Sequence, residues 1–528
     1  MREVLFCNAS ILTLSDPPEA QALLCRNGQV VCVGTLPQAR SAARSVPQEI
    51  DLGGRRVIPA FVDGHSHLTA YAQTQLLCDL SSAESFEDLR RLLTDFARAH
   101  VFLAGQWLLA FGYDHTHLQE GCHPDAAWLD ELFPATPVLL THASGHMGVV
   151  NSLGLQALGV TRDTPDPEGG RIGHDAAGQL TGYLEEAAFQ QYSARIPKPD
   201  LEDTLAALAH AQELYAAQGI VTTQDALVRR GDWGLLSAAA QRGLLNLDTP
   251  CYLDVMSFSA GPEELGDRWQ QYDGHLRAAG YKLFLDGSPQ GKTAWLSQPY
   301  EGETSYRGYP VHSDEEVREA VRRAIAQKRQ LVTHCNGDAA IDQLLRICEE
   351  QPEAVRPLRF VVIHAQCLRP DQLPRLRALN MSVSFFIAHT WYWGDVHLRN
   401  LGPERAGRIS PLRSTLNADV PASLHQDTPV IAPNMLESMA CAMERITLSG
   451  QVLGPEERVG VLDALRTVTT APAWQLFEEN QKGKLAPGFR CDLAVLDTDI
   501  LSASLQEIRR AKVLATYAAG EEVWRAKA

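Results

Sequence analysis

The sequence has no Cys-x-x-Cys pair and no long uninterrupted apolar run. Its 11 cysteines are an odd number scattered from Cys7 to Cys491, which is typical of reduced thiols in a cytoplasm and gives no zinc-knuckle spacing. The longest apolar stretch, around Val101–Tyr113, contains Gly and Gln and is too short to cross a bilayer. The first residues lack a continuous apolar core, so we expect no secretory signal. These absences predict a cytoplasmic protein with no membrane partner.

Basic residues are also fewer than acidic residues. Lys plus Arg number 47 against 64 for Asp plus Glu, a net charge of −17, which argues against nucleic acid as a partner. The 45% of hydrophobic and 21% of charged residues are ordinary for a folded protein. A chain of 528 residues suits a large barrel with a smaller accessory domain. We therefore expect an enzyme acting on a small molecule, with a homodimer as the default assembly.

Short apolar runs separated by turn residues mark both ends of the chain. Residues 1–58 contain several such runs. Residues 475–528 show the same pattern of short apolar runs after the turn signal Gly483–Gly488. Both termini are predicted to build one small β-sandwich. The remaining residues, 59–474, alternate apolar runs with helical stretches such as Glu315–Lys328, which indicates parallel β-α units.

Eight candidate strands lie in this central region, and eight parallel strands are typical of a (β/α)8 TIM-like barrel. The first two are separated by far more residues than a crossover helix needs, so we expect an insertion at about residues 105–193. The fold class is therefore predicted to be α/β. The strands are Val57–Val62, Ile220–Gln224, Cys251–Val255, Lys282–Leu285, Gln330–Thr333, Phe360–Ile363, Ser382–Phe386 and Ala422–Leu424.

Polar side chains collect at the ends of these strands, where a barrel has its active-site face. His65 and His67 are two apart, so in an extended chain they project to the same side and form a two-nitrogen chelate. A lone histidine at a strand end is usually structural, but matching ligands on several strands favour a metal centre. The remaining donors are Lys282, His334, His364 and Asp427.

This pattern resembles the amidohydrolase superfamily, in which H-x-H is followed by Lys or Glu, His, His and Asp. Further motifs resemble the branch that contains N-substituted formamide deformylase, and an insertion after strand one is a feature of that branch. The motifs are Lys282–Ser288, Thr333–Ala339, Ala143–His146 with Asn151-Ser152, Thr164–Ile172, His389 with Trp393–Asp395, and His425–Pro429.

The resemblance implies that His65, His67, His334, His364 and Asp427 bind metal. It also implies that Lys282 is carboxylated and bridges two zinc ions. Charge supports this role, because an ammonium would be repelled by divalent cations whereas a lysine carbamate is an anion. The alternative is a lysine that extends to the barrel rim.

A metal pair would lower the pKa of the attacking water, and Asp427 would take its proton and return it to the leaving amine. His389 is a candidate donor to the substrate carbonyl, with Trp391 and Trp393 as pocket walls; a core or helix-capping histidine is the alternative. His146 is a candidate substrate contact that the motif suggests, with an ordinary loop histidine as the alternative.

Two positions depart from the branch pattern. Gln426 replaces a small residue before Asp427 and is expected to narrow the pocket, and Cys335 replaces a small apolar residue. Neither position is a ligand. We therefore expect these departures to affect the choice of substrate more than the mechanism.

The resulting prediction is a zinc-dependent hydrolase that acts on a C–N bond other than a peptide bond, with an amide or formamide as substrate. One alternative is a mononuclear zinc deaminase of the same superfamily. Such deaminases typically have Glu where this chain has Gly337, and they lack the strand-four lysine. The other is a catalytically silent barrel that only binds ligands, although loss of activity normally shows as missing ligands.

Overall fold

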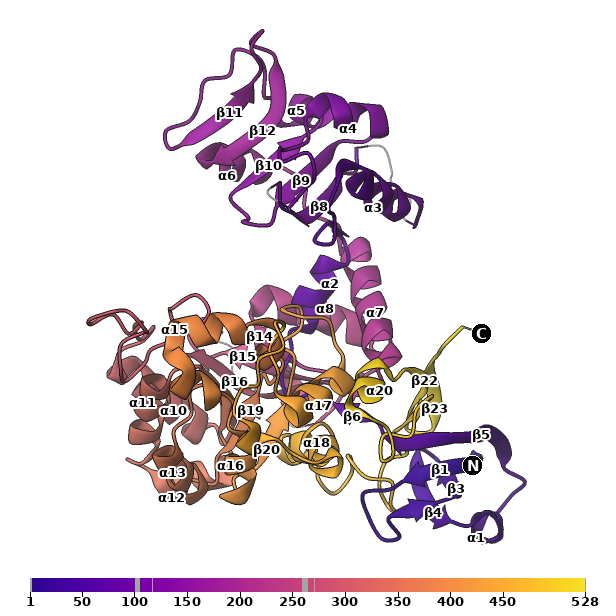
Figure 1. Cartoon of the computed structure of the whole chain (residues 1–528). Coiled ribbons are helices and arrows are strands. Elements are labelled where there is room, and N and C mark those ends of the chain that lie inside the picture. Colours follow the sequence, from indigo (N-terminus) through magenta and orange to yellow (C-terminus); the bar gives the residue numbers. More distant parts are fainter. Residues whose placement is uncertain (1, 100–104, 116, 259–264, 270, 528) are drawn as a thin grey trace. The chain divides into compact units, whose positions relative to one another are not determined.

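The computed structural model describes residues 2–99, 105–115, 117–258, 265–269 and 271–527. The chain divides into two compact units. Unit 1 comprises residues 1–71 and 209–528, and unit 2 comprises residues 72–208. Unit 2 therefore extends further on both sides than the insertion expected at about 105–193. Figure 1 shows the elements of each unit.

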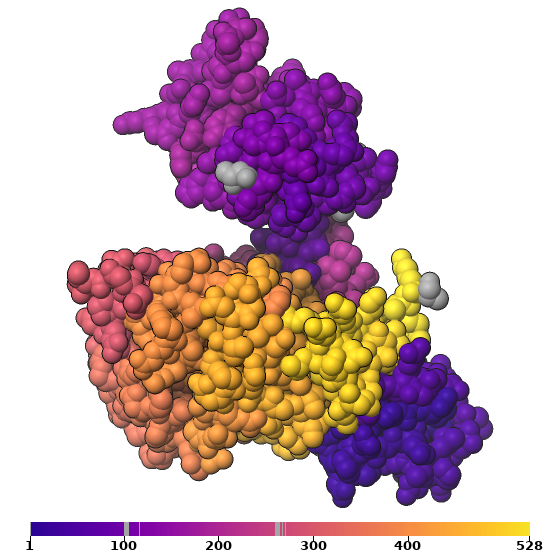
Figure 2. Space-filling view, in the orientation of Figure 1, coloured from indigo at the N-terminus to yellow at the C-terminus, as the bar shows by residue number. Residues whose placement is uncertain are grey.

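Strands from both chain ends form one connected sheet in unit 1. The ladder between β5 and β21 is antiparallel, with Val57 opposite Val495, and it joins the two termini. We expected a sandwich, whereas the ladders place these strands in a single sheet. In Figure 2 the yellow C-terminal segment lies against the indigo N-terminal one. The order is β23 (Glu521–Arg525), β22 (Val513–Ala518), β21 (Leu493–Leu496), β5 (Gln48–Pro59), β1 (Glu3–Leu12), β3 (Ala22–Arg26) and β4 (Gln29–Gly34), with β2 (Glu19–Ala20) beside β1.

Apolar residues explain why this sheet forms. Most residues of β1 and β3 are buried, Phe6 and Leu23 completely, and the rings of Phe6 and Tyr517 meet edge to face at 4.9 Å. Burying such side chains contributes roughly 1.5–3 kcal/mol each relative to leaving them exposed. The same cluster takes residues from both ends of the chain, so neither end completes this core alone.

The central strands of unit 1 are parallel. Seven of them form one sheet, and β6 (Phe61–Val62) pairs with β13 (Ile220–Thr222) in a second. The loops after β6 and β20 are joined because the amide of His67 donates to the Thr428 carbonyl at 2.9 Å. Every predicted strand overlaps an observed one. The seven-stranded order is β14 (Asp225–Val228), β15 (Thr249–Asp254), β16 (Leu276–Phe284), β17 (Gln330–Cys335), β18 (Val361–His364), β19 (Ser382–Phe385) and β20 (Ala422–Leu424).

Amphipathic helices connect these strands. In α10, the Ser313 side chain accepts from the backbone of Glu316 and the Glu316 side chain reaches back to Ser313, which satisfies the first free amides of the helix. Val317 and Val321 face the interior. The helices of unit 1 include α8 (Arg230–Gln241), α10 (Asp314–Ala326), α11 (Asp338–Cys348), α13 (Leu373–Ala378), α14 (His389–Tyr392), α15 (Gly394–Gly407), α16 (Leu412–Asn417), α17 (Met435–Glu444), α18 (Val461–Thr467), α19 (Thr470–Gln475) and α20 (Leu505–Arg510).

Unit 2 has its own mixed sheet and its own apolar cores. Its strands β7, β8 and β9 are parallel to one another, and the others are antiparallel. The order is β11 (Gly170–His174), β12 (Leu180–Glu186), β10 (Met147–Val150), β9 (Val138–His142), β8 (Leu108–Tyr113) and β7 (Cys78–Asp79). The helices α3 (Phe86–Ala99), α4 (Ala126–Leu132), α5 (Ser152–Leu158) and α6 (Ala187–Ser193) accompany this sheet.

The described part of the chain contains no helix long and apolar enough to cross a membrane. The apolar stretch singled out in the sequence supplies strand β8 instead. Residues 101–104 of that stretch lie outside the described residues.

Candidate metal centre

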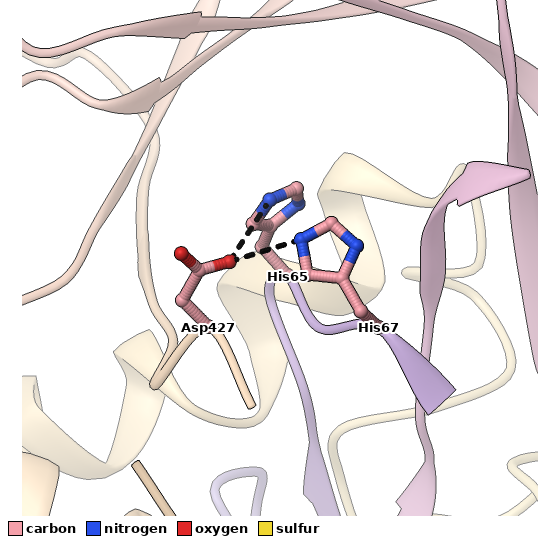
Figure 3. A group of neighbouring side chains, drawn as sticks. All are labelled: His65, His67 and Asp427. Carbon is pink, nitrogen blue, oxygen red and sulfur yellow. Dashed lines mark hydrogen bonds and ion pairs between the residues drawn. The ribbon is translucent and has the colours of Figure 1, made fainter. Parts of the chain in front are cut away.

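Three of the predicted donors meet at the carboxyl ends of the parallel strands. His65 and His67 follow β6, and Asp427 follows β20. The Oδ1 atom of Asp427 lies 3.1 Å from His67 Nε2 and 3.4 Å from His65 Nε2, as Figure 3 shows. One donor atom from each residue lies within 4.8 Å of the other two. This spacing suits three ligands of one cation.

Lys282 points to the same place from β16. Its side chain is fully buried, and its Nζ atom lies 3.1 Å from His65 Nε2. Burial lowers the pKa of the Lys282 amine to about 7, because a charged ammonium is poorly solvated in the interior. A large fraction of the amine is therefore uncharged near neutral pH.

His334 and His364 close the other side of the group. Their rings are 4.5 Å apart between centroids, and His364 Nε2 lies 3.9 Å from Asp427 Oδ2. The Nε2 atom of His334 lies 3.2 Å from the carbonyl oxygen of Gly287. If Nε2 carries the proton and donates to that carbonyl, Nδ1 of His334 is left as the ligating nitrogen.

The electrostatics keep the rings of His65, His334 and His364 neutral and the Asp427 carboxylate charged. Burial, followed by the charge of Lys282, lowers the pKa of His65 and brings that of His334 to about 4. Burial opposes ionisation of Asp427, but the hydrogen bond from His67 and the neighbouring rings hold its pKa well below the usual range. Neutral imidazole and ionised carboxylate are the forms that bind a metal.

The backbone is strained at two of these residues. His364 has φ of 70° and Asp427 has φ of 54°, the left-handed region that non-glycine residues rarely adopt. Such conformations cost on the order of 1–3 kcal/mol and persist where the surrounding packing imposes them, often at functional sites. His364 ends β18 and Asp427 lies three residues after the end of β20, so both strained conformations occur at the carboxyl ends of the parallel strands.

His425 belongs to this region although it was not among the predicted donors. It is fully buried, its Nε2 lies 3.1 Å from His364 Nδ1, and its Nδ1 lies 2.8 Å from Ser384 Oγ. Its position two residues before Asp427 was the available signal. His425 and Asp427 are two residues apart, as His65 and His67 are, and residues two apart in an extended chain project to the same side. This spacing would have predicted that His425 lies on the same side as Asp427.

The predicted substrate residues divide into separate places. His389 is buried, its Nδ1 lies 3.2 Å from His397 Nε2, and its ring lies 4.7 Å from that of Trp393. The guanidinium of Arg509 instead lies over the ring of Trp391, 4.3 Å from the centroid of that ring. Trp393 therefore shares the surroundings of His389, whereas Trp391 contacts helix α20. The fourth residue, His146, lies in unit 2, where it pairs with Glu186 at 3.1 Å.

Gln426 does not narrow a pocket, contrary to our expectation. Its side chain is fully buried and bonds to the backbone of Asn434, donating to the carbonyl at 2.7 Å and accepting from the amide. These bonds tie the loop that follows Asp427 to the start of α17. Cys335 is buried, and burial raises the pKa of its thiol, so it is an unreactive filler.

The donor set fits a divalent metal. It combines neutral imidazoles with a carboxylate in a buried setting, the ligands that suit zinc and similar ions. The buried Nδ1 atom of His65 has no hydrogen-bond partner among the described residues. Buried polar atoms are normally paired, so this group is incomplete as an ordinary hydrogen-bonded core.

Fold and site together define a metal-dependent hydrolase. The family model described as "Amidohydrolase family" matches residues 48–524, so the chain belongs to that family. The resemblance stated from the sequence is confirmed.

Individual relatives match over nearly the whole chain. N-substituted formamide deformylase from Arthrobacter pascens is 29% identical, covering 98% of each chain. Protein LONG AFTER FAR-RED 3 from Arabidopsis thaliana is 27% identical over 99% of this chain and 91% of its own. An uncharacterized metal-dependent hydrolase from Pyrococcus furiosus has a TM-score of 0.75 at 26% identity, covering 95% of this chain and 100% of that one.

Proposed function

We propose that this protein is a zinc-dependent amidohydrolase that cleaves a non-peptide C–N bond in a small amide or formamide. The observation that carries the proposal is the meeting of His65, His67 and Asp427 within 4.8 Å, with Lys282 beside them. The likeness to a deformylase supports the C–N bond as the target. The fold that we propose is a (β/α)8 barrel with unit 2 inserted after its first strand.

In this proposal the residues that would hold two zinc ions are His65, His67, His334, His364 and Asp427, and a carboxylated Lys282 would be a further anionic ligand. Bound zinc supplies water activation at neutral pH and polarises the scissile carbonyl. Carboxylation forms a bond between the uncharged Nζ and the carbon of CO2 and releases one proton. The low pKa of the buried Lys282 amine supports this step because only the uncharged amine reacts.

Asp427 moves the proton in the proposed reaction. Its carboxylate is ionised, and one oxygen is held by His67 at 3.1 Å. It accepts a proton from the attacking water and gives it to the leaving nitrogen, which must be protonated to depart. His389 donates a hydrogen bond to the substrate carbonyl oxygen, and Trp393 lies beside it as an apolar wall.

The deaminase alternative meets a steric obstacle. Deaminases of the superfamily typically have a glutamate at the position of Gly337, but a Cβ atom on Gly337 would lie 1.9 Å from the carbonyl oxygen of Trp295. The same Gly337 amide donates to Asp286 at 2.7 Å, which fixes the loop. A glutamate therefore has no room unless this loop moves.

Two further predictions accompany the proposal. The cysteines of the described residues are all unpaired, which supports a reducing compartment such as the cytoplasm. A homodimer remains the default expectation for the assembly.

The test combines metal analysis with a substrate panel. Zinc-replete protein is assayed for release of amine from N-formyl amines, N-acyl amino acids and cyclic amides, with His67→Ala as the inactive control. We expect turnover of at least one class and at least one equivalent of zinc per chain. Protein that binds less than one equivalent after zinc-replete expression would refute the proposal.

A further inference from the structure

A second group of donor side chains lies in unit 2, in a place that favours ligands. Strands β8 and β9 are parallel neighbours, and Tyr113 is paired with His142 at their carboxyl ends. Asp114 and His115 directly follow β8, and His142 ends β9. In α/β sheets, ligands bind beyond the carboxyl ends of parallel strands.

The donor atoms of this group converge as closely as those of the barrel. His142 Nε2 lies 3.2 Å from His115 Nδ1 and 3.4 Å from Asp114 Oδ1, and His115 Nδ1 lies 3.9 Å from that same oxygen. The three atoms lie within 4.8 Å of one another. One imidazole is buried and the other two side chains are about 30% exposed. An ion can therefore reach the group from solvent.

Two further residues complete the surroundings. The ring of His123 stacks on His115 with 3.9 Å between centroids, and its Nδ1 lies 3.0 Å from the hydroxyl of Tyr113. With Nδ1 engaged, Nε2 is the nitrogen through which His123 can act as a further ligand. Two imidazoles and a carboxylate therefore converge, with His123 stacked beside them, and such a mixed set of donors suits a zinc-type ion.

The metal-free and metal-bound forms differ in which nitrogen of His142 carries its proton. The amide of Ser144 donates to His142 Nδ1 at 3.0 Å, so in the neutral ring the proton is on Nε2, facing Asp114 and His115. A cation replaces that proton, and the ring then carries its proton on Nδ1, where Ser144 Oγ at 3.0 Å accepts it. Ser144 is exposed, so water can solvate its amide.

We propose that Asp114, His115 and His142 form a second metal site, with His123 as a further ligand. The mixture of imidazole and carboxylate donors selects a divalent transition metal of the zinc type over magnesium or calcium, which prefer oxygen ligands. This site lies within unit 2 and does not depend on the hydrolase proposal. It would stabilise the edge of the sheet by joining the ends of β8 and β9.

The test uses the full chain and counts zinc. In one variant, His65→Ala and His67→Ala remove part of the barrel centre; in another, His115→Ala and His142→Ala remove the unit 2 donors. We expect the His65→Ala, His67→Ala variant to lose the zinc of the barrel centre and keep that of unit 2. The His115→Ala, His142→Ala variant should lose the zinc of unit 2 and keep that of the barrel centre. Titration against a chromogenic chelator measures affinity, which should fall by about tenfold or more for Asp114→Asn in the barrel-deficient background.

A matched control separates the site from general surface histidines. His174 is exposed in the same sheet, where its Nδ1 contacts the Ile172 carbonyl at 3.0 Å, so His174→Ala should leave the zinc count unchanged. Circular dichroism checks that every variant is folded. If the barrel-deficient chain binds no more zinc than the same chain carrying His115→Ala and His142→Ala, the unit 2 site does not exist. Loss of amide hydrolysis alone would bear only on the barrel.

Discussion

The Nε2 atom of His425 lies 3.1 Å from the Nδ1 atom of His364, and Ser384 Oγ lies 2.8 Å from Nδ1 of the same His425. If the His364 Nδ1–H donates to His425, the His425 Nδ1–H donates in turn to Ser384. This chain leaves Nε2 of His364 unprotonated and directed towards Asp427, 3.9 Å away. His425 is therefore a positioning residue for the metal centre.

His425→Ala should weaken zinc binding by roughly 10–100-fold, because a ligand ring that loses its outer partner is no longer held in one tautomer and orientation. Competition with a chromogenic chelator measures this affinity. His425→Gln keeps an acceptor near His364 and is expected to recover part of the loss. Equal affinity in wild type and His425→Ala would remove the positioning role.

Lys282→Ala should lower kcat/KM by at least about 10²-fold, since the proposed carbamate contributes several kcal/mol of metal-mediated stabilisation. Added acetate or propionate should restore part of the activity by occupying the vacated space as a carboxylate. Lys282→Met fills that space with an uncharged chain and is the control that we expect not to respond. A failure of short carboxylates to act on the Ala variant would contradict a carbamate at this position.

Asp427→Asn should reduce kcat by roughly 10²–10⁴-fold, the range that a positioned general base contributes. The hydrogen bond from His67 and the neighbouring rings hold the pKa of Asp427 well below its usual range, so its carboxylate is ionised at neutral pH and protonation of Asp427 should not limit the wild-type rate there. Rate measurements across pH test this. An Asn variant with near-normal turnover would exclude Asp427 as the proton carrier.

Gly337→Ala should destabilise the fold by about 1–3 kcal/mol, the usual cost of forcing extra atoms into packed structure. A Cβ there would lie 1.9 Å from the Trp295 carbonyl oxygen, whereas a Cβ on Gly231 in helix α8 would meet nothing within 4 Å. Gly231→Ala is therefore the matched control, with an expected gain of about 0.5–1 kcal/mol. Midpoints of urea unfolding decide between them, and equal midpoints would contradict the close approach at Gly337.

A buried ion pair connects the parallel strands of unit 1 to the C-terminal segment. The Lys482 ammonium lies 2.6 Å from Asp248, and both side chains are 4% exposed. Arg490 and His275 also contact Asp248. Asp248→Asn should destabilise unit 1 by less than the roughly 3–5 kcal/mol that an uncompensated buried charge costs, because Lys482 still pairs with Glu478 and Arg490 with Asp492.

The pH dependence of this effect has a definite sign. Burial opposes ionisation of Asp248, but Lys482, His275 and Arg490 outweigh it and hold its pKa well below the usual range. A depressed carboxyl pKa stabilises the fold above the unfolded value of about 3.9 and loses that contribution as the pH falls below it. The gap between the urea midpoints of wild type and Asp248→Asn should therefore be largest at pH 6 and begin to narrow as the pH falls below about 4. A constant difference would contradict this assignment.

Much of the site could be predicted from the sequence because its donor residues directly follow recognisable apolar runs. Apolar runs that end in His, Lys or Asp predict strand ends. Parallel strands bring such ends to one edge, so His65, His67 and Asp427 could be grouped although the chain separates them by more than 350 residues. The amidohydrolase resemblance rested on the same positions.

The tertiary structure decided what depends on side-chain direction and on contacts between distant segments. Gln426 is polar and next to Asp427, yet it turns to the backbone of Asn434 and not to a pocket. The unit 2 donors were overlooked because Asp114 and His115 meet His142 only through the pairing of β8 with β9.

Sequence alone determined the class of protein, since strand-end ligands and family motifs are local features that persist in any correct fold. Only the folded chain determined that His425 holds His364, that Gly337 faces Trp295, and that the two termini share one sheet. Each of these depends on which of many compatible neighbours packs against a given side chain. That choice is made by the burial of the whole core rather than by any local run of residues.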